Sequence, residues 1–268
     1  MAELLVRSPD GTQISSESSG EGRPLVIVSG AIFPSARWLS VTSLLAAERR
    51  PIVIDRRGRG KSGDTAPYAP EREVEDILAV LAGIPGPVDL LGHSSGAILS
   101  LQVAARVPAN LERLIAYEPP VFFNEVDSIA PDLPERLDAL LAAGERGAAV
   151  ETFLREGPRV PERELQGMQA STFWPQLLAA LAHTVPYDSR VQRSFKADPA
   201  ELARIRIPTL MLIGGASPER MMAGARTVAS RLPHAQIGEL AGQQHVAQLS
   251  AAPLFAATVN AFLSSRAG

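Results

Sequence analysis

The feature that most constrains this chain is the segment Gly92-His93-Ser94-Ser95-Gly96, which lies between two apolar runs. Residues 88–91 have the pattern of a buried strand, and residues 97–105 are typical of a helix. A strand that reverses into a helix within a few residues strains the central residue and presents its hydroxyl at the tip of the turn. Glycines on both sides remove side chains that would collide there. The pattern therefore predicts a nucleophile elbow with Ser94 at its tip, rather than a flexible Gly/Ser loop.

Composition sets the class of the protein and excludes several kinds of partner. The 268 residues are 46% hydrophobic, carry a net charge of −3 and include no cysteine, which excludes disulfides, thiolate catalysis and cysteine-bound metals. The basic residues are scattered, so neither nucleic acid nor an anionic membrane is an expected partner. The sequence shows no signal peptide and no run long enough to span a bilayer. We expect a cytoplasmic monomer or homodimer that acts on a small molecule.

Short apolar runs alternate with amphipathic helical segments over much of the chain. The clearest predicted strands are residues 25–28, 51–55, 111–118 and 207–214. Alternation of this kind indicates an α/β fold with a mostly parallel, twisted sheet and helices on both faces. The rhythm stops over residues 121–203, where prolines break up helical pieces. We therefore predict a core domain of residues 1–120 and 204–268, with a helical insertion of residues 121–203.

A serine hydroxyl needs a base, an acid that orients the base, and N–H donors for the oxyanion that forms. His245 follows the predicted strand 236–240, so it emerges at the carboxyl edge of the sheet, as the elbow does. The other three histidines are not expected to act as the base. They are His93, His183 and His234. For the oxyanion we expect the N–H of Ser95 and one N–H from the loop after residue 28, at Ala31.

The elbow around Ser94, the loop 55–62 and the His245 loop together resemble the α/β-hydrolase superfamily. The resemblance covers nearly the whole chain, and the insertion stands where that family has its cap. It implies the α/β-hydrolase fold and a serine-nucleophile enzyme similar to esterases and lactonases, with no cofactor. One departure concerns the oxyanion loop, which usually begins His-Gly in the family and begins Ser29-Gly30 here.

The resemblance also raises the question of which residue is the acid. Most members carry it after the strand that corresponds to residues 209–213, where this chain has Ser217, and a serine cannot stabilise an imidazolium by charge. Some members carry it one strand earlier, which is Glu118 here. A carboxylate at the tip of an apolar strand is costly to bury without a partner. We therefore predict Glu118 as the acid, with Glu219 as the alternative.

Residues 58–63 match a G-x-G-x-x-G pattern after a strand, but the next predicted strand ends without the acid that a dinucleotide site needs. We interpret this loop as a structural turn in which Asp55 and its neighbouring arginines pair locally. No spacing of histidines and carboxylates indicates a metal site.

Several apolar side chains are candidates for a substrate pocket over Ser94. They are Ile32, Phe122, Phe123, Trp174 and Val246. The aromatic members are equally compatible with a core inside the insertion. The expected reaction is cleavage of a carboxylic ester, lactone or thioester. The same residues are compatible with carbon–carbon bond hydrolysis, with cofactor-free haloperoxidase or lyase chemistry, or with a small-molecule receptor that keeps the fold.

Overall fold

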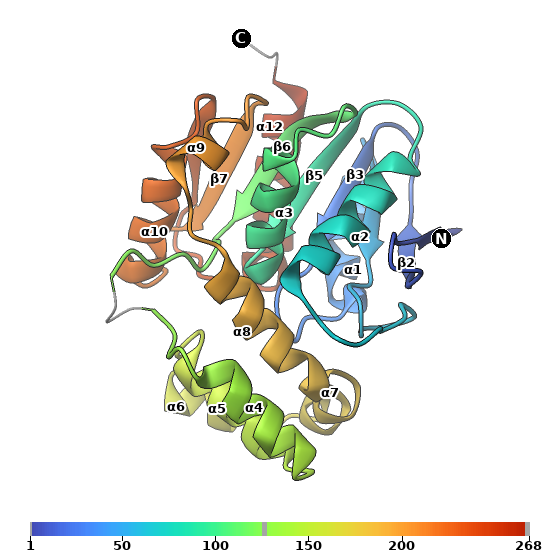
Figure 1. Cartoon of the computed structure of the whole chain (residues 1–268). Helices are drawn as coiled ribbons and strands as arrows, with labels where there is room; N and C mark the ends of the chain where they lie inside the picture. The colour runs from blue at the N-terminus through green and yellow to red at the C-terminus, as the bar shows by residue number, and fades with distance from the viewer. Residues whose placement is uncertain (1, 125–127, 266–268) are drawn as a thin grey trace.

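The computed structural model describes residues 2–124 and 128–265, in which eight strands form one sheet (Figure 1). The strand order is β1-β2-β4-β3-β5-β6-β7-β8. β1 pairs antiparallel with β2, and β2 with β4, while every other pair is parallel. This confirms the expected α/β class. The strands are β1 (Ala2–Arg7), β2 (Gln13–Ser18), β3 (Pro24–Val28), β4 (Arg50–Ile54), β5 (Val88–His93), β6 (Leu111–Tyr117), β7 (Thr209–Gly214) and β8 (Ala235–Leu240).

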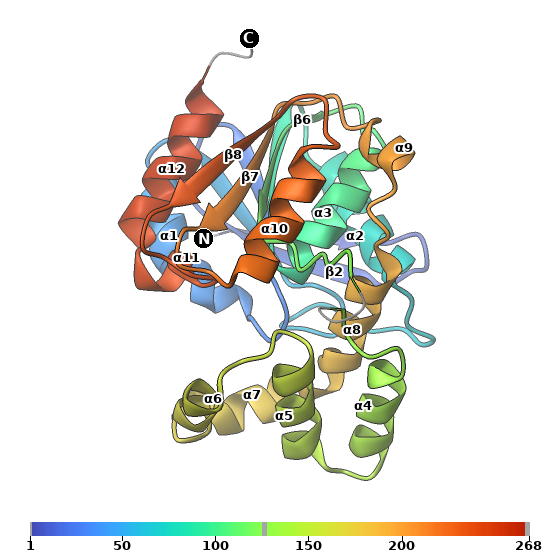
Figure 2. The same ribbon diagram turned by 90° about the vertical axis from the view of Figure 1, so that its left-hand side faces the viewer.

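Helices cover both faces of this sheet, as Figures 1 and 2 show. On one face α2 (Pro70–Ala82), α3 (Ser95–Ala105) and α10 (Glu219–Ala229) bury their apolar sides in one core cluster. On the other face α1 (Leu39–Leu45) and α12 (Ala252–Ser264) form a second cluster. The apolar runs of β3 and β5 are fully buried because both faces are covered. Two short elements complete the core domain, the 3-10 helix Ser35–Trp38 and α11 (Ala247–Ser250).

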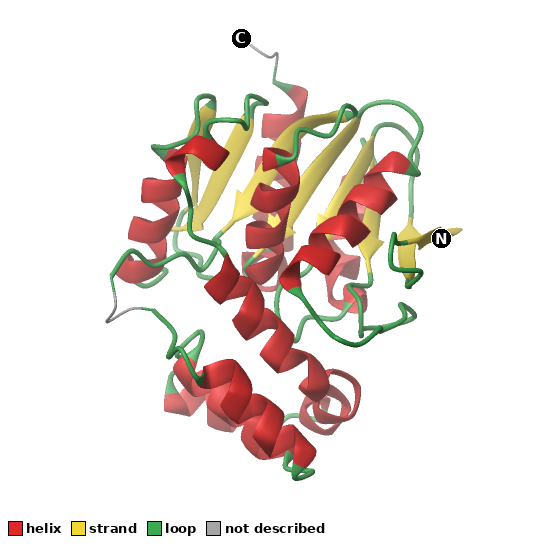
Figure 3. Ribbon diagram, viewed as in Figure 1, coloured by secondary structure: helices red, strands yellow, loops and turns green. Residues whose placement is uncertain are grey.

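The segment after β6 forms a unit that contains helices and loops but no strand in its described part (Figure 3). Its helices are α4 (Leu133–Ala142), α5 (Arg146–Glu156), α6 (Glu162–Gln169), α7 (Phe173–Leu181), the 3-10 helix Ala182–Thr184, α8 (Val185–Ser194) and α9 (Pro199–Leu202). Leu133, Phe153 and Leu177 belong to its own apolar core. Val191 and Leu202 instead pack in the core of the sheet, so α8 and α9 lead back into the main domain.

The close packing of α3 against β3 gives a test of the elbow. A β-carbon at Gly96 would lie 2.3 Å from the Val28 carbonyl oxygen, whereas the exposed Gly167 of α6 has nothing within 4 Å. We expect Gly96→Ala to lower the free energy of unfolding by at least ~2 kcal/mol. Gly167→Ala should be neutral or stabilising, because alanine favours a helix by up to about 1 kcal/mol. Urea unfolding measures both, and equal stability of the two variants would contradict the packing argument.

Candidate active site

Ser94 lies at the tip of a strained turn between β5 and α3. Its backbone has a φ of 56° and a ψ of −124°, which few residues with a side chain adopt. A β-carbon at Gly92 would lie 2.4 Å from the Gly96 oxygen, so the turn leaves no room for a side chain there. The Ser94 N–H donates to the Tyr117 carbonyl at 2.9 Å. The segment therefore has the geometry of a nucleophile elbow, held against β6.

Glu118 follows β6, and its buried side chain contacts both His245 and the end of β7. One carboxylate oxygen lies 2.7 Å from His245 Nδ1, and the other accepts the Gly214 N–H at 2.7 Å. Burial by itself raises the pKa of Glu118, but the hydrogen bond and the charge of His245 outweigh it and bring the pKa below its usual value. Glu118 is therefore ionised at neutral pH and keeps a proton on His245 Nδ1.

The alternative acid lies elsewhere. Glu219 is 73% exposed at the start of α10 and pairs with Arg226 at 3.5 Å. No hydrogen bond or ion pair between described residues joins Glu219 to His245. Ser217 is buried, and a β-carbon at Gly214 would lie 2.8 Å from its hydroxyl oxygen. Ser217 therefore occupies the neighbourhood of Glu118, which makes the position usable for an acid in a variant.

His93 is a residue of this site that sequence reasoning missed. Its Nε2 donates to the His245 carbonyl oxygen at 2.9 Å, and its ring lies 4.8 Å from the His245 ring. Burial, together with the charge of His245, holds the pKa of His93 well below its usual range, so the ring stays neutral. The Tyr117 hydroxyl donates to the Gln244 carbonyl and accepts the Ala247 N–H at 3.1 Å. Side chains from β5 and β6 thus fix the His245 loop, although the sequence offers no local signal for this.

The loop after β3 lies directly against the elbow. A β-carbon at Gly30 would lie 2.8 Å from Ser94 Cβ, so only glycine permits this approach. The Ser29 hydroxyl accepts the Trp38 indole N–H at 2.9 Å, which anchors the loop where the family usually has a histidine. Ser95 begins α3, and the N–H of the first residue of a helix has no helical acceptor. Ala31 and Ser95 therefore flank the serine from two sides.

Backbone strain is concentrated around these residues. Ile32, Ser94 and Glu118 all have a positive φ, at 45°, 56° and 45°. A β-branched residue such as isoleucine is a true outlier there, and such strain is of order 1–3 kcal/mol per residue. The three residues follow the ends of the neighbouring strands β3, β5 and β6. The sheet thus holds three unfavourable conformations at one edge.

A cluster of four buried charged side chains adjoins the elbow, and we call Arg56, Arg59, Glu73 and Asp188 the buried charge cluster. The Arg56 guanidinium donates to Asp188 at 2.8 Å and to Glu73 at 2.7 Å. It also donates to the Ser95 hydroxyl at 3.1 Å and to the Ser29 carbonyl at 3.2 Å. Arg56 thus connects both segments that flank Ser94.

The partners of this cluster come from distant parts of the chain. Asp188 lies in α8, where it also accepts hydrogen bonds from Arg59 and from the Ser95 hydroxyl, each at 2.8 Å. Burial by itself raises the pKa of Asp188, but the two arginines outweigh it and lower the pKa. Our expectation that the arginines of the loop pair locally was wrong, because their carboxylates lie in α2, in α8 and in the turn between β1 and β2. A single sequence cannot reveal such pairs, since each partner is more than a dozen residues away.

The predicted pocket residues lie in three different places. Ile32 and Trp174 are partly buried against the apolar core of the helical segment after β6. Phe122 and Phe123 line a different cavity of about 300 Å³, beside the end of α8. Their rings contact the guanidinium groups of arginines in and after α10. Val246 is 42% exposed next to His245. The structure therefore does not gather the five residues into one pocket.

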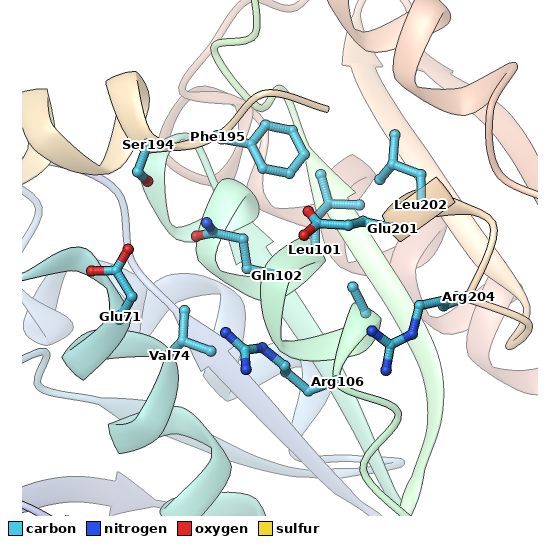
Figure 4. Close-up of a pocket in the computed structure, with 11 residues that line it drawn as sticks. Glu71, Val74, Leu101, Gln102, Arg106, Ser194, Phe195, Glu201, Leu202 and Arg204 are labelled. Carbon is cyan, nitrogen blue, oxygen red and sulfur yellow. The ribbon is translucent and has the colours of Figure 1, made fainter. Parts of the chain in front are cut away.

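A larger cavity of about 410 Å³ lies between α2, the end of α3 and the segment that joins α8 to α9 (Figure 4). Charged side chains on its rim include Glu71, Arg106, Glu201 and Arg204. The residues of α3 that line this cavity begin at Leu101, which lies about 9 Å along the helix from Ser95. It contains no histidine, and we do not assign it to the active site.

Among the residues that the structure describes, no group of three or more histidine and carboxylate side chains could hold a metal ion. In the same part of the chain, no helix is long and apolar enough to cross a membrane.

The buried charge cluster predicts a large difference between two carboxylates of the helical insertion. Asp188→Asn removes the negative charge that two buried arginines share. We expect it to lower the free energy of unfolding by roughly 3 kcal/mol. Asp138→Asn removes a partly exposed pair with Arg190 and should change it by less than ~1 kcal/mol. Urea unfolding of both variants tests this, and a loss of similar size in each would refute the role of the cluster.

Comparisons with known proteins agree with the fold. A family profile described as alpha/beta hydrolase family matches residues 25–258. The chain is also similar to an alpha/beta hydrolase of known structure from Sphaerobacter thermophilus. The two are 41% identical with a TM-score of 0.90, over 97% of this chain and 100% of that chain.

Two named relatives match shorter segments. N-formylmaleamate deformylase of Pseudomonas putida is 35% identical over 127 residues, or 46% of this chain and 47% of that protein. Pimeloyl-[acyl-carrier protein] methyl ester esterase of Aeromonas hydrophila is 31% identical over 180 residues, or 62% of this chain and 68% of that protein. The first match thus spans about half the length of the relative. Because the profile extends over most of the sheet and includes the elbow, the chain belongs to the alpha/beta hydrolase family.

Proposed function

We propose that this chain is a serine hydrolase that cleaves a carboxylic ester, lactone or thioester of a small substrate through an acyl-enzyme. Ser94 is the nucleophile, His245 the base and Glu118 the acid that orients it. The observation that carries the proposal is the 2.7 Å contact between Glu118 and His245 Nδ1, beside a serine in an elbow. This is the arrangement that nucleophilic catalysis by serine requires.

The proposed cycle follows from which ring nitrogen of His245 is free to accept a proton. Because Nδ1 is bound to Glu118, Nε2 of His245 takes the Ser94 proton while Oγ attacks the carbonyl carbon. His245 then passes this proton to the leaving alkoxide or thiolate, and the acyl group stays on Ser94. Water attacks the acyl-enzyme in the same way, which releases the acid. In the described residues no hydrogen bond joins Ser94 to His245, so the two approach each other when substrate binds.

The N–H groups of Ser95 and Ala31 are the proposed donors to the oxyanion. The Ser95 N–H is supported by its place at the start of α3, and Ala31 by the contact of its neighbour Gly30 with Ser94. Preorganised backbone donors of this kind contribute several kcal/mol, roughly 3 per donor, to the transition state. No cofactor takes part in the proposed reaction.

The names of the relatives support ester hydrolysis but leave room for other bonds. One is a methyl ester esterase and another a deformylase, so similar chains act on different carbonyl compounds. Carbon–carbon hydrolysis has a specific point in its favour, because a 2-hydroxy-6-oxo-2,4-heptadienoate hydrolase of Pseudomonas putida is 34% identical over 113 residues. A panel of short nitrophenyl esters, lactones, thioesters and vinylogous diketones separates these reactions. Turnover of the diketones alone would replace the ester proposal.

The nucleophile is tested by a fluorophosphonate probe. We expect one labelled serine, Ser94, located by peptide mass, and no label in Ser94→Ala. The same variant should lose about 10⁴–10⁶-fold in kcat on any ester that the panel identifies. An exposed serine serves as the control, because Ser230→Ala keeps the nucleophile and should still be labelled. An unlabelled wild-type chain would refute the proposed nucleophile.

The acid is tested by exchanging its position. Glu118→Gln should lower kcat about 10⁴-fold, because an amide does not stabilise the imidazolium, while Glu219→Gln should leave kcat within about twofold. Ser217→Asp in the Glu118→Gln background should recover part of the loss, since Ser217 adjoins the same Gly214 backbone. If Glu118→Gln retains full activity, Glu118 is not the acid.

A further inference from the structure

Arg37 is a positively charged residue that the proposed cycle does not use. It lies in the 3-10 helix Ser35–Trp38, only a few residues beyond the proposed oxyanion donor Ala31. Its guanidinium carbon lies 5.2 Å from the centre of the Phe33 ring and 4.9 Å from the centre of the Phe173 ring. Phe33 belongs to the loop after β3, and Phe173 begins α7 of the helical insertion. The charge of Arg37 therefore lies where the two domains meet.

This guanidinium has no anionic partner in the part of the chain that the structure describes. Within residues 2–124 and 128–265, Arg37 forms no ion pair and its side chain makes no hydrogen bond. It is partly buried, and burial lowers its pKa without any carboxylate to oppose the effect. Arg56 and Arg57, in contrast, each pair with two carboxylates. The two aromatic contacts stabilise a cation but accept none of its five in-plane N–H donors. Arg37 thus keeps an unused set of donors in a partly desolvated place.

Ring contacts connect this charge to the reacting groups. The Phe33 ring meets the His93 ring edge-on at 5.5 Å, and His93 adjoins His245 at 4.8 Å. On the same loop Gly30 contacts Ser94. One short stretch of chain, residues 30–37, therefore connects the contact with Ser94 to the charge of Arg37. A guanidinium binds a carboxylate through two parallel N–H donors, which neither water nor an aromatic ring matches.

We propose that Arg37 binds a carboxylate of the substrate, so that the preferred substrates are esters or lactones that carry a second, ionised carboxyl group. This inference rests on the proposed hydrolysis at Ser94 and names its substrate class. The competing explanation is that Arg37 only holds α7 to the core through its two ring contacts. The two explanations differ in how replacing Arg37 affects different substrates. Loss of a structural contact affects every substrate equally, whereas loss of an anion site affects only the charged ones.

The test uses two substrates that differ mainly in the terminal group. They are mono-4-nitrophenyl adipate, which ends in a carboxylate, and 4-nitrophenyl heptanoate, which ends in a methyl group. We expect wild-type kcat/KM to be higher for the adipate, after subtraction of spontaneous hydrolysis. Arg37→Gln should lower kcat/KM for the adipate by about 10–100-fold, mainly through KM, and leave the heptanoate within about twofold. Added salt should weaken the adipate preference of the wild type and not that of the variant.

Further variants separate binding from structure. Arg37→Lys keeps the charge and should retain part of the adipate preference, whereas Phe173→Leu removes one ring contact and should preserve the preference. Arg136→Gln, on an exposed surface of α4, should change neither substrate. Thermal unfolding shows whether each variant is folded. If Arg37→Gln is unfolded, the substrate preferences of Arg37→Lys and Phe173→Leu decide between the two explanations.

Three results would count against the proposals, and each has one meaning. If Arg37→Gln lowers kcat/KM equally for both substrates, Arg37 only holds α7 to the core, and the proposal is overturned. If the wild-type protein has the same kcat/KM for both esters, the proposal is overturned as well, while hydrolysis of the heptanoate still supports the proposed function. Failure of wild-type protein on both esters, with Ser94 unlabelled, refutes the hydrolase proposal itself.

Discussion

The ion pairs of Arg56 are the interaction on which the rest of the site depends. A buried guanidinium is tolerated only because Glu73 and Asp188 supply two carboxylates at hydrogen-bonding distance. The same guanidinium holds the Ser29 carbonyl and the Ser95 hydroxyl, one on each side of the serine. Desolvation makes these bonds directional and costly to break. One side chain therefore sets the spacing between the two segments that are proposed to bind the oxyanion.

Strain and burial act together at the carboxyl edge of the sheet. Ile32, Ser94 and Glu118 adopt unfavourable backbone angles, which persist only where the surrounding contacts are stronger. Each of them follows a strand that hydrogen-bonds to its neighbours, and Glu118 is held further by the Gly214 N–H. The parallel sheet thus acts as the rigid support that a preorganised site needs. The His245 ring is the partly exposed member of the proposed triad, and in the proposed cycle it approaches Ser94 when substrate binds.

The sequence was informative wherever the chemistry is local. The elbow and the strands β3 to β7 follow from glycine spacing and apolar runs, because both are properties of adjacent residues. Glu118 was predicted from the resemblance to the family, because Ser217 stands where most members carry the acid. The role of His93 and the pairing of Arg56 with Asp188 were not predictable, because they depend on which side chains meet across the sheet and the insertion. Phe122 and Phe123 show the same limit, as their aromatic character alone did not tell which cavity they line.

The helical insertion is coupled to the site by charge on one side and by an aromatic contact on the other. Asp188 of α8 bonds the Ser95 hydroxyl, so α8 cannot shift without disturbing the first turn of α3. Phe173 of α7 meets Arg37 through a softer cation–π contact, which tolerates small displacements. Displacing α8 therefore costs more than displacing α7, because it would expose two arginines and two carboxylates. Arg37 lies at the softer contact with α7 and has no carboxylate partner among the described residues.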